Sequence, residues 1–227
     1  MKYIQKIEAP NYFIEESKEL QLELESSKNK SKIWDNLRCK RELKEYILEN
    51  EQNGLCGYCE AKIKDINKSH IEHIEAKNRD YINLTFDYNN LIVSCDGLCF
   101  NDKNQRLTCG HKKDSKGYKV DYNLFLNPTK TENIRDYFIY SEQGFIGASN
   151  LDIDSSKETM RVLNLNDPNN QLPQERQKSL SEFRIKIKEA SIKSGKSIKY
   201  ITKFLLAKEN LAFISFLQFK FKKYLID

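Results

Sequence analysis

The sequence of 227 residues carries 38 basic and 33 acidic side chains, a formal net charge of +5, and a mean hydropathy of −0.72. This length suits one domain or a small core with extensions, and the polar composition excludes a membrane-embedded protein. The opening residues lack the apolar stretch of a secretion signal, so we expect a bacterial cytoplasmic protein with reduced cysteines. The modest positive charge permits nucleic-acid binding without requiring it.

Residues 1–53 are predicted to form an N-terminal helical extension. Residues 1–9 fit a short strand, and residues 14–25 fit a polar helix. After a polar loop, apolar side chains recur at helical spacing over residues 32–50, and Asn53-Gly54 is a typical helix end. We expect the apolar face of this second helix to pack on the segment that follows.

Five of the six cysteines fall in the next segment, residues 54–125, which we predict to be the functional core. Cys56 and Cys59 form a C-x-x-C pair, the spacing of a zinc-binding turn, and Gly57 between them suits a turn that other residues could not adopt. Cys95 and Cys109 are expected to complete a structural zinc site, with Cys99 as the alternative ligand. Such a site contributes on the order of 10 kcal/mol to folding. The alternatives are reduced, buried thiols or a redox pair.

All three histidines lie inside this cysteine frame. The pattern predicts a first strand carrying His70, Glu72 and His73, a second strand ending at Cys95, and a short helix at His111. Adjacent residues of a regular strand point to opposite faces, so Glu72 and His73 can share a site only if the strand bends or bulges. A neutral imidazole can deprotonate water, and a divalent cation needs oxygen or imidazole ligands.

Residues 126–227 are predicted to form a β-hairpin and a C-terminal helical region. The elements are a hairpin over residues 137–148, a helix capped by Asp154 or Ser155, and helices over residues 174–194 and 197–225. The last helix mixes phenylalanine and tyrosine with lysine. Such a mixture can stack on single-stranded bases, but at helical spacing it more often forms core or a partner-docking face, which is our expectation here.

Several blocks of the sequence resemble those of a known enzyme class. Glu72-His73-Ile74, Asn90-Leu91 followed by Ser94-Cys95, and Cys109-Gly-His-Lys-Lys113 resemble the three signature blocks of HNH endonucleases with a ββα-metal fold. The blocks Leu55–Glu60, His70–His73, Leu84–Leu91 and residues 158–166 are similar to the nucleases of Septu-type and retron-associated anti-phage systems (PtuB-like). The similarity covers most of the chain.

The resemblance implies an α+β fold, in which a ββα-metal HNH core held by a four-cysteine zinc knuckle is flanked by N- and C-terminal helices. It implies that His73 is the general base and that Glu72 and His111 are ligands of the catalytic ion, Mg²⁺ or another divalent cation. Asn90 would brace the loop that carries the base. His70 is an extra imidazole that could replace Glu72 as the metal ligand.

Four basic residues near these blocks are candidate nucleic-acid contacts, because positive charge supplies most sequence-independent affinity for phosphates. They are Lys77, Arg79, Lys112 and Lys113. The resemblance implies a DNA substrate, with tRNA or another RNA as the alternative, and an ATPase subunit (PtuA-like) as partner. In retron-associated systems the partners include a reverse transcriptase and its msDNA. The chain itself carries no nucleotide-binding loop.

The sequence therefore predicts a metal-dependent endonuclease that hydrolyses phosphodiester bonds in an anti-phage defence system. The alternative is a non-catalytic zinc-knuckle module that binds nucleic acid or a partner protein. That alternative explains the cysteines but not the joint presence of Glu72, His73, Asn90 and His111. The aromatic C-terminal helix is the candidate docking surface for the ATPase.

Overall fold

The structure is a computed structural model that describes residues 1–27, 30–77, 82–97, 107–167 and 171–225. The fold is mixed α+β, and its strands form two separate two-stranded sheets. The α-helices are α1 (Asn11–Ser26), α2 (Lys40–Asn50), α3 (Cys109–Lys113), α4 (Ile153–Leu163), α5 (Leu172–Ser194), α6 (Ile198–Leu206), α7 (Ile214–Lys220) and α8 (Lys222–Leu225). The strands are β1 (Ser69–His73), β2 (Leu91–Cys95), β3 (Phe138–Tyr140) and β4 (Ile146–Ala148). The short 3₁₀ helices are η1 (Lys30–Asn36), η2 (Ile66–Lys68), η3 (Ile82–Leu84), η4 (Tyr88–Asn90) and η5 (Ile134–Tyr137).

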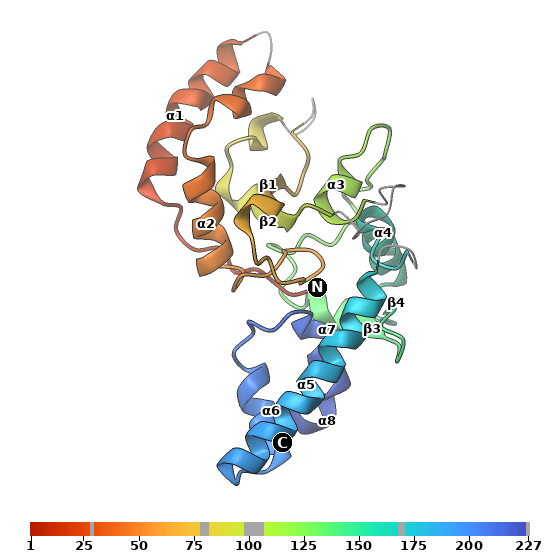
Figure 1. The fold of residues 1–227 in the computed structure, drawn as a ribbon. Helices are drawn as coiled ribbons and strands as arrows, with labels where there is room; N and C mark the ends of the chain where they lie inside the picture. The colour runs from red at the N-terminus through yellow and green to blue at the C-terminus, as the bar shows by residue number, and fades with distance from the viewer. Residues whose placement is uncertain (28–29, 78–81, 98–106, 168–170, 226–227) are drawn as a thin grey trace.

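The β1–β2 hairpin lies between the N-terminal helices and α3. Figure 1 shows α1 and α2, in red and orange, on one side of the hairpin and α3 on the other, with α5 to α8 in blue forming the opposite end of the molecule. The strands pair antiparallel in an unbroken register from Ser69 opposite Cys95 to His73 opposite Leu91. The bulge expected between Glu72 and His73 is therefore absent from this strand pair.

The N-terminal extension packs on one face of the hairpin. Its apolar residues form a buried cluster with residues that precede or belong to β2: Phe13, Leu24, Ile33, Trp34, Leu37, Leu43, Ile47, Leu48, Phe86, Tyr88, Leu91 and Val93. The polar helix predicted over residues 14–25 is confirmed as α1. The helix predicted over residues 32–50 is divided into η1 and α2. Residues 1–9 do not form the expected strand, although the Ile4 N–H donates a hydrogen bond to the Pro128 carbonyl.

The C-terminal region departs from the prediction at two places. The hairpin over residues 137–148 is confirmed as β3 and β4. The cap of α4 is Asp152, whose side chain accepts a hydrogen bond from the Ser155 N–H, rather than Asp154 or Ser155. The single helix expected over residues 197–225 is broken into three: Glu209 and Phe213 adopt positive φ angles of 52° and 56° between α6 and α7, and Phe221 separates α7 from α8. Within the described residues, no helix combines the length and the apolar character needed to cross a bilayer.

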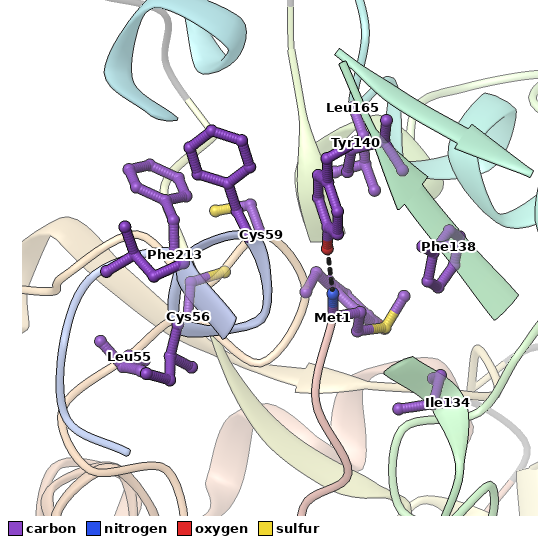
Figure 2. Close-up of a cluster of buried hydrophobic side chains, with 14 of the residues drawn as sticks. Met1, Leu55, Cys56, Cys59, Ile134, Phe138, Tyr140, Leu165 and Phe213 are labelled. Carbon is purple, nitrogen blue, oxygen red and sulfur yellow. Dashed lines mark hydrogen bonds between the residues drawn. The ribbon is translucent and has the colours of Figure 1, made fainter. Parts of the chain in front are cut away.

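A second buried cluster joins the two ends of the chain to the cysteine-rich turn. It includes Met1, Cys56 and Cys59 together with the buried aromatic side chains of β3, α7 and the segments beside them. Figure 2 shows Met1 beneath Tyr140, with its amino group 3.3 Å from the tyrosine hydroxyl. Phe213, Phe216 and Phe221 are buried here, so most of the C-terminal aromatic residues form core.

A substitution at Arg176 can test how much buried polar contacts stabilise the region around this cluster. Its side chain is 1% exposed, and its Nη1 atom donates to the carbonyl oxygens of Gly144, at 2.9 Å, and Leu165, at 3.2 Å. Arg176→Met should lower the free energy of unfolding by roughly 2–4 kcal/mol, because it leaves two buried carbonyl groups without donors. Urea unfolding measures the change. Lys186→Met, at an exposed position of the same helix, should stay close to wild type, and an equal effect of both changes would contradict the structural role of Arg176.

Candidate functional site

Four cysteines from three chain segments meet beside the hairpin. Cys56 and Cys59 lie in the turn before β1, Cys95 ends β2, and Cys109 begins α3. Their sulfur atoms all lie within 4.8 Å of one another, and the Cys59 and Cys95 Sγ atoms are 3.9 Å apart. A tetrahedral zinc ion with Zn–S bonds of about 2.3 Å separates its sulfurs by about 3.8 Å. The predicted four-cysteine cluster is therefore confirmed as a group placed to hold a metal ion, and Cys99 lies outside the described residues.

The cluster has the chemistry of a metal site as well as its geometry. Burial alone would raise the pKa of Cys56, but hydrogen bonds from Cys109, Cys59 and Cys95 lower it well below the ordinary value. A hydrogen bond with Cys109 would lower the pKa of Cys95, but hydrogen bonds with Cys56 and Cys59 and burial raise it above the ordinary value, and hydrogen bonds with the other three thiols raise the pKa of Cys109. Without a metal the four sulfurs thus favour one thiolate held by its neighbours. A zinc ion would stabilise all four as thiolates, so this donor set fits zinc.

Gly57, between the first two cysteines, is required for space rather than for an unusual turn. Its φ angle is not positive, so the expectation that Gly57 adopts a turn conformation closed to other residues is wrong. A Cβ atom at this position would lie 2.9 Å from Ile92 Cδ1 and 3.1 Å from Ile4 Cδ1. The turn therefore packs its backbone directly on β2 and on the N-terminal segment, which holds Cys56 and Cys59 close to the end of β2.

One face of β1 turns His70 and Glu72 toward α3. His70 Nε2 lies 3.2 Å from Glu72 Oε2, and the rings of His70 and His111 are 4.3 Å apart between centroids. Gly110 allows this approach, because a Cβ atom there would lie 2.6 Å from His70 Nε2. The structure thus brings together three of the predicted site residues, His70, Glu72 and His111.

The carboxylate of Glu72 is fully paired inside the protein. Its Oε1 atom accepts from the Tyr58 hydroxyl at 3.2 Å and faces Lys113 Nζ at 3.0 Å, while Oε2 faces His70. Burial would raise the pKa of Glu72, but the charges of Lys113 and His70 outweigh it and lower the pKa. Glu72 is therefore an ionised carboxylate, 1% exposed, with an ammonium group as its nearest cation.

Lys113 does not occupy the surface position that the sequence suggested. Its side chain is 2% exposed and also contacts Asp114 Oδ1 at 2.6 Å. Burial would lower the pKa of Lys113, but Glu72 and Asp114 raise it above the ordinary value. The expectation of a surface phosphate contact is corrected at this residue, because its charge is already taken up by two carboxylates.

The other predicted phosphate contacts lie closer to the surface. Lys112 is half-buried, with its ammonium 4.4 Å from the Tyr118 ring centroid. Lys77 lies 5.6 Å from the Trp34 ring. Arg79 lies outside the described residues.

His73 has a separate set of partners from Glu72, as the alternation of a regular strand requires. Its ring packs edge-on against Trp34 with centroids 4.5 Å apart, and its Nε2 atom lies 3.0 Å from the Thr85 carbonyl oxygen. A carbonyl only accepts, so Nε2 carries the proton of the neutral ring and Nδ1 carries the lone pair. Burial lowers the pKa of His73 to about 4, against the smaller opposite effect of the Thr85 hydrogen bond. The charges of Glu72 and Lys113 both act on this ring.

Asn90 connects the chain on either side of the His73 pocket. Its side-chain oxygen accepts from the Glu75 N–H at 2.8 Å, and its amide nitrogen donates to the carbonyls of Glu75, at 3.0 Å, and Leu84, at 3.3 Å. Asn90 is 5% exposed. It therefore ties the segment just after His73 to the segment just before Thr85, the residue that holds the imidazole.

In the part of the chain that the structure describes, the two imidazoles are free of a competing cation, whereas Glu72 is paired with Lys113. His70 Nδ1 is buried without a hydrogen-bond partner, and the nearby His111 is exposed. Imidazole nitrogen suits several divalent transition metals. Glu72 could join such a site only if Lys113 moved away. Within the described ranges, no group of three or more metal-binding side chains other than the four-cysteine cluster is gathered around a common point.

Three residues that shape this site were not predicted from the sequence: Trp34, Tyr58 and Thr85. The backbone carbonyl of Thr85 carries no residue-specific signal. Tyr58 lies inside the C-x-x-C pair, a position that could have suggested proximity to the first strand. No family model matches this chain, and no curated protein shows detectable similarity to it.

Zinc content tests the cysteine assignment. The purified protein should contain about one zinc per chain, and Cys109→Ser should lose it together with much of the thermal stability, because zinc binding and folding are coupled. Elemental analysis and thermal unfolding measure both effects. Cys39→Ser is the matched control, since Cys39 is half-buried and outside the cluster. Cys99→Ser should also keep its zinc. Full zinc content in Cys109→Ser would refute the four-ligand site.

The burial of His73 makes a prediction about pH. His73 has a folded pKa of about 4 against 6.5 as its ordinary value. As pH falls, the unfolded chain therefore takes up a proton at His73 before the folded chain does. The free energy of unfolding is unaffected by His73 above its ordinary pKa and decreases as pH falls toward the folded-state pKa. The loss from His73 should reach roughly 2 kcal/mol between about pH 7.5 and about pH 5. Chemical unfolding of wild type and His73→Phe should give profiles that converge on acidification. Parallel profiles would show that His73 is not held neutral.

Proposed function

We propose that this chain is a metal-dependent endonuclease of the HNH type that hydrolyses phosphodiester bonds in nucleic acid. The observation that carries the proposal is the arrangement around the hairpin. Two strands and a short helix, joined by the four-cysteine cluster, bring His70, Glu72 and His111 together, and β1 also carries a neutral His73 with separate partners. Together with the resemblance of the three sequence blocks, this arrangement supports a hydrolase over an isolated zinc knuckle.

In this proposal His73 is the general base. Thr85 fixes the ring so that Nδ1 is the atom that takes a proton from water. A pKa of about 4 keeps the imidazole neutral at physiological pH but makes it a weak base. A phosphodiester bound beside the ring would raise its basicity, because a nearby negative charge favours the protonated form. Asn90 maintains the loop geometry on which this orientation depends.

His70 and His111 are the residues that would hold a divalent cation, Mg²⁺ or another, and Glu72 would join them after Lys113 moves. When bound, such an ion supplies charge stabilisation at the phosphate and at the leaving oxygen. In the absence of an ion, Lys113 neutralises Glu72 and keeps the carboxylate oriented. The buried Glu72–Lys113 ion pair thus preserves the shape of the site, and a bound ion would have to displace it.

The target and the partners follow from the resemblance. DNA is the first candidate substrate, and tRNA or another RNA is the second. The resemblance to Septu-type and retron-associated nucleases favours action in anti-phage defence, with a PtuA-like ATPase as partner and, in a retron system, a reverse transcriptase with its msDNA. Lys112 and Lys77 lie close enough to the surface beside the site to contact phosphates.

One observation favours the alternative, a non-catalytic zinc-knuckle module that binds nucleic acid or a protein. Glu72 is already neutralised by Lys113, as expected if it serves only to support the fold. This alternative gives no reason for the fixed tautomer of His73 or for the buried, unpartnered Nδ1 atom of His70. We therefore place it second.

A cleavage assay decides between these functions. The chain, alone and with its ATPase, should cut plasmid DNA or tRNA in the presence of Mg²⁺ or Mn²⁺, and His73→Ala should lower the rate at least about 10²-fold, since a general base contributes roughly 10²–10⁴. Lys186→Met, at an exposed position of α5, serves as the unchanged control.

The zinc content and thermal unfolding of His73→Ala should match those of wild type, so that lost cleavage reports on chemistry. Cleavage by His73→Ala at the wild-type rate would exclude His73 as the base. The absence of any metal-dependent cleavage, together with intact zinc, would leave the binding module as the function.

A further inference from the structure

One segment of the chain carries basic residues without any acidic ones. Residues 193–208 contain five lysines and no acidic residue, and this local charge equals the net charge of +5 of the whole chain. The segment contains α6 and the turn before it. Figure 1 shows α6 at the end of the molecule opposite the β1–β2 hairpin, so this charge lies apart from the site described above.

Two aromatic side chains of this basic segment lie on the exposed side of α6. Tyr200 is 49% exposed and Phe204 is 52% exposed, whereas Ile201, Thr202 and Leu206 on the other side of the helix are buried. The rings of Tyr200 and Phe204 are parallel to within 5°, with centroids 6.5 Å apart. Exposed aromatic residues that gather on one face commonly mark a contact surface.

Lysines flank the two rings in line. Lys196 Nζ lies 4.3 Å from the Tyr200 ring centroid, and Lys208 Nζ lies 4.6 Å from the Phe204 ring centroid. Tyr200 and Phe204 are four apart within α6 and so share one face of the helix, and Lys196 and Lys208 lie just beyond its two ends. We call this row of Lys196, Tyr200, Phe204 and Lys208 the lysine–aromatic ladder.

We propose that the lysine–aromatic ladder binds single-stranded nucleic acid, with bases stacked on Tyr200 and Phe204 and phosphates held by the lysines. A single strand presents flat aromatic faces and negative charges in alternation, which is the complement of this row. Stacking of a base on a ring is a stronger contact than an exposed cation–π pair. Bases can therefore displace the two ammonium groups, which remain close enough to meet the phosphates.

The shape of α6 favours this ligand over a lipid surface or an apolar protein groove. A helix that enters such an environment presents a broad apolar face. Ile201 and Leu206 of α6 are already buried in the protein, and its exposed side offers two rings between lysines with Ile198 as the one exposed aliphatic residue of this helix. The inference goes beyond the proposed nuclease function, since binding at the ladder can be measured without cleavage.

The test is fluorescence anisotropy with a labelled single-stranded oligothymidylate and with a duplex of the same length, in buffer without added divalent ions. Wild type should bind the single strand more tightly than the duplex, whose base faces are hidden. The double variant Tyr200→Ala/Phe204→Ala should raise the Kd at least about 30-fold, from the loss of two stacked bases. Phe145→Ala removes an exposed aromatic ring from the β3–β4 turn and should leave the Kd unchanged.

Two further variants identify the kind of contact. Lys196→Gln/Lys208→Gln should reduce the salt dependence of binding by about 1.4 in log–log slope, the value for two phosphate contacts of a single strand. Tyr200→Leu/Phe204→Leu keeps an apolar surface without rings and should bind as weakly as the alanine variant. Thermal unfolding should show that each variant is folded.

The proposal is overturned if wild type does not bind the oligonucleotide at low salt, or if the leucine variant binds like wild type. It is also overturned if the alanine variant keeps its affinity for nucleic acid and instead loses an ATPase partner. Because none of these readouts depends on cleavage, failure of the ladder and failure of the proposed nuclease activity remain distinguishable.

Discussion

The convergence of four sulfur atoms is the constraint on which the rest of the site depends. The segments that carry Cys56 and Cys59, Cys95, and Cys109 are far apart in sequence, and α3 is only five residues long. A helix of this length has too few internal hydrogen bonds to be stable alone. A metal ion at the four-cysteine cluster would fix the start of α3 against the end of β2, the junction at which His111 lies beside His70 and Lys113 beside Glu72.

Two neighbouring residues of the site differ in ionisation, since Glu72 is charged and His73 is neutral. Both Glu72 and His73 are buried, yet Glu72 stays ionised because Lys113 and His70 face it, whereas His73 stays neutral because aromatic side chains and a carbonyl surround it. The difference originates in the unbroken pairing of β1 with β2, which turns adjacent side chains to different surroundings. The regular pairing therefore gives the two side chains separate partners, Lys113, His70 and Tyr58 for Glu72 and Trp34 and Thr85 for His73.

Much of this could be predicted from the sequence, and the remainder depends on information that is not local. Cysteine spacing predicted the metal cluster and its C-x-x-C pair, but it left Cys99 open as an alternative to the ligands from the later cysteines. Apolar periodicity was sufficient for α1 and for the β3–β4 hairpin. The burial of Lys113 was not predictable, since a lysine after His111 and Lys112 has the composition of a surface segment. The breaks at Glu209 and Phe213 were missed because tertiary packing, rather than propensity, imposes their positive φ angles. The hydrogen bond to Thr85 involves only a backbone carbonyl, so no side-chain pattern could reveal it.

Glu60 connects the four-cysteine cluster to segments outside the β1–β2 hairpin. This residue follows Cys59 directly and is 2% exposed, and its carboxylate accepts from the Ser215 N–H at 2.8 Å and faces the Met1 amino group at 3.3 Å. Loss of the ion would free the turn that positions this carboxylate. The contacts of Glu60 with α7 and with Met1 would weaken as a result. Oxidation of the thiols, or removal of the metal by a chelator, would therefore destabilise the C-terminal helices as well as the cysteine cluster.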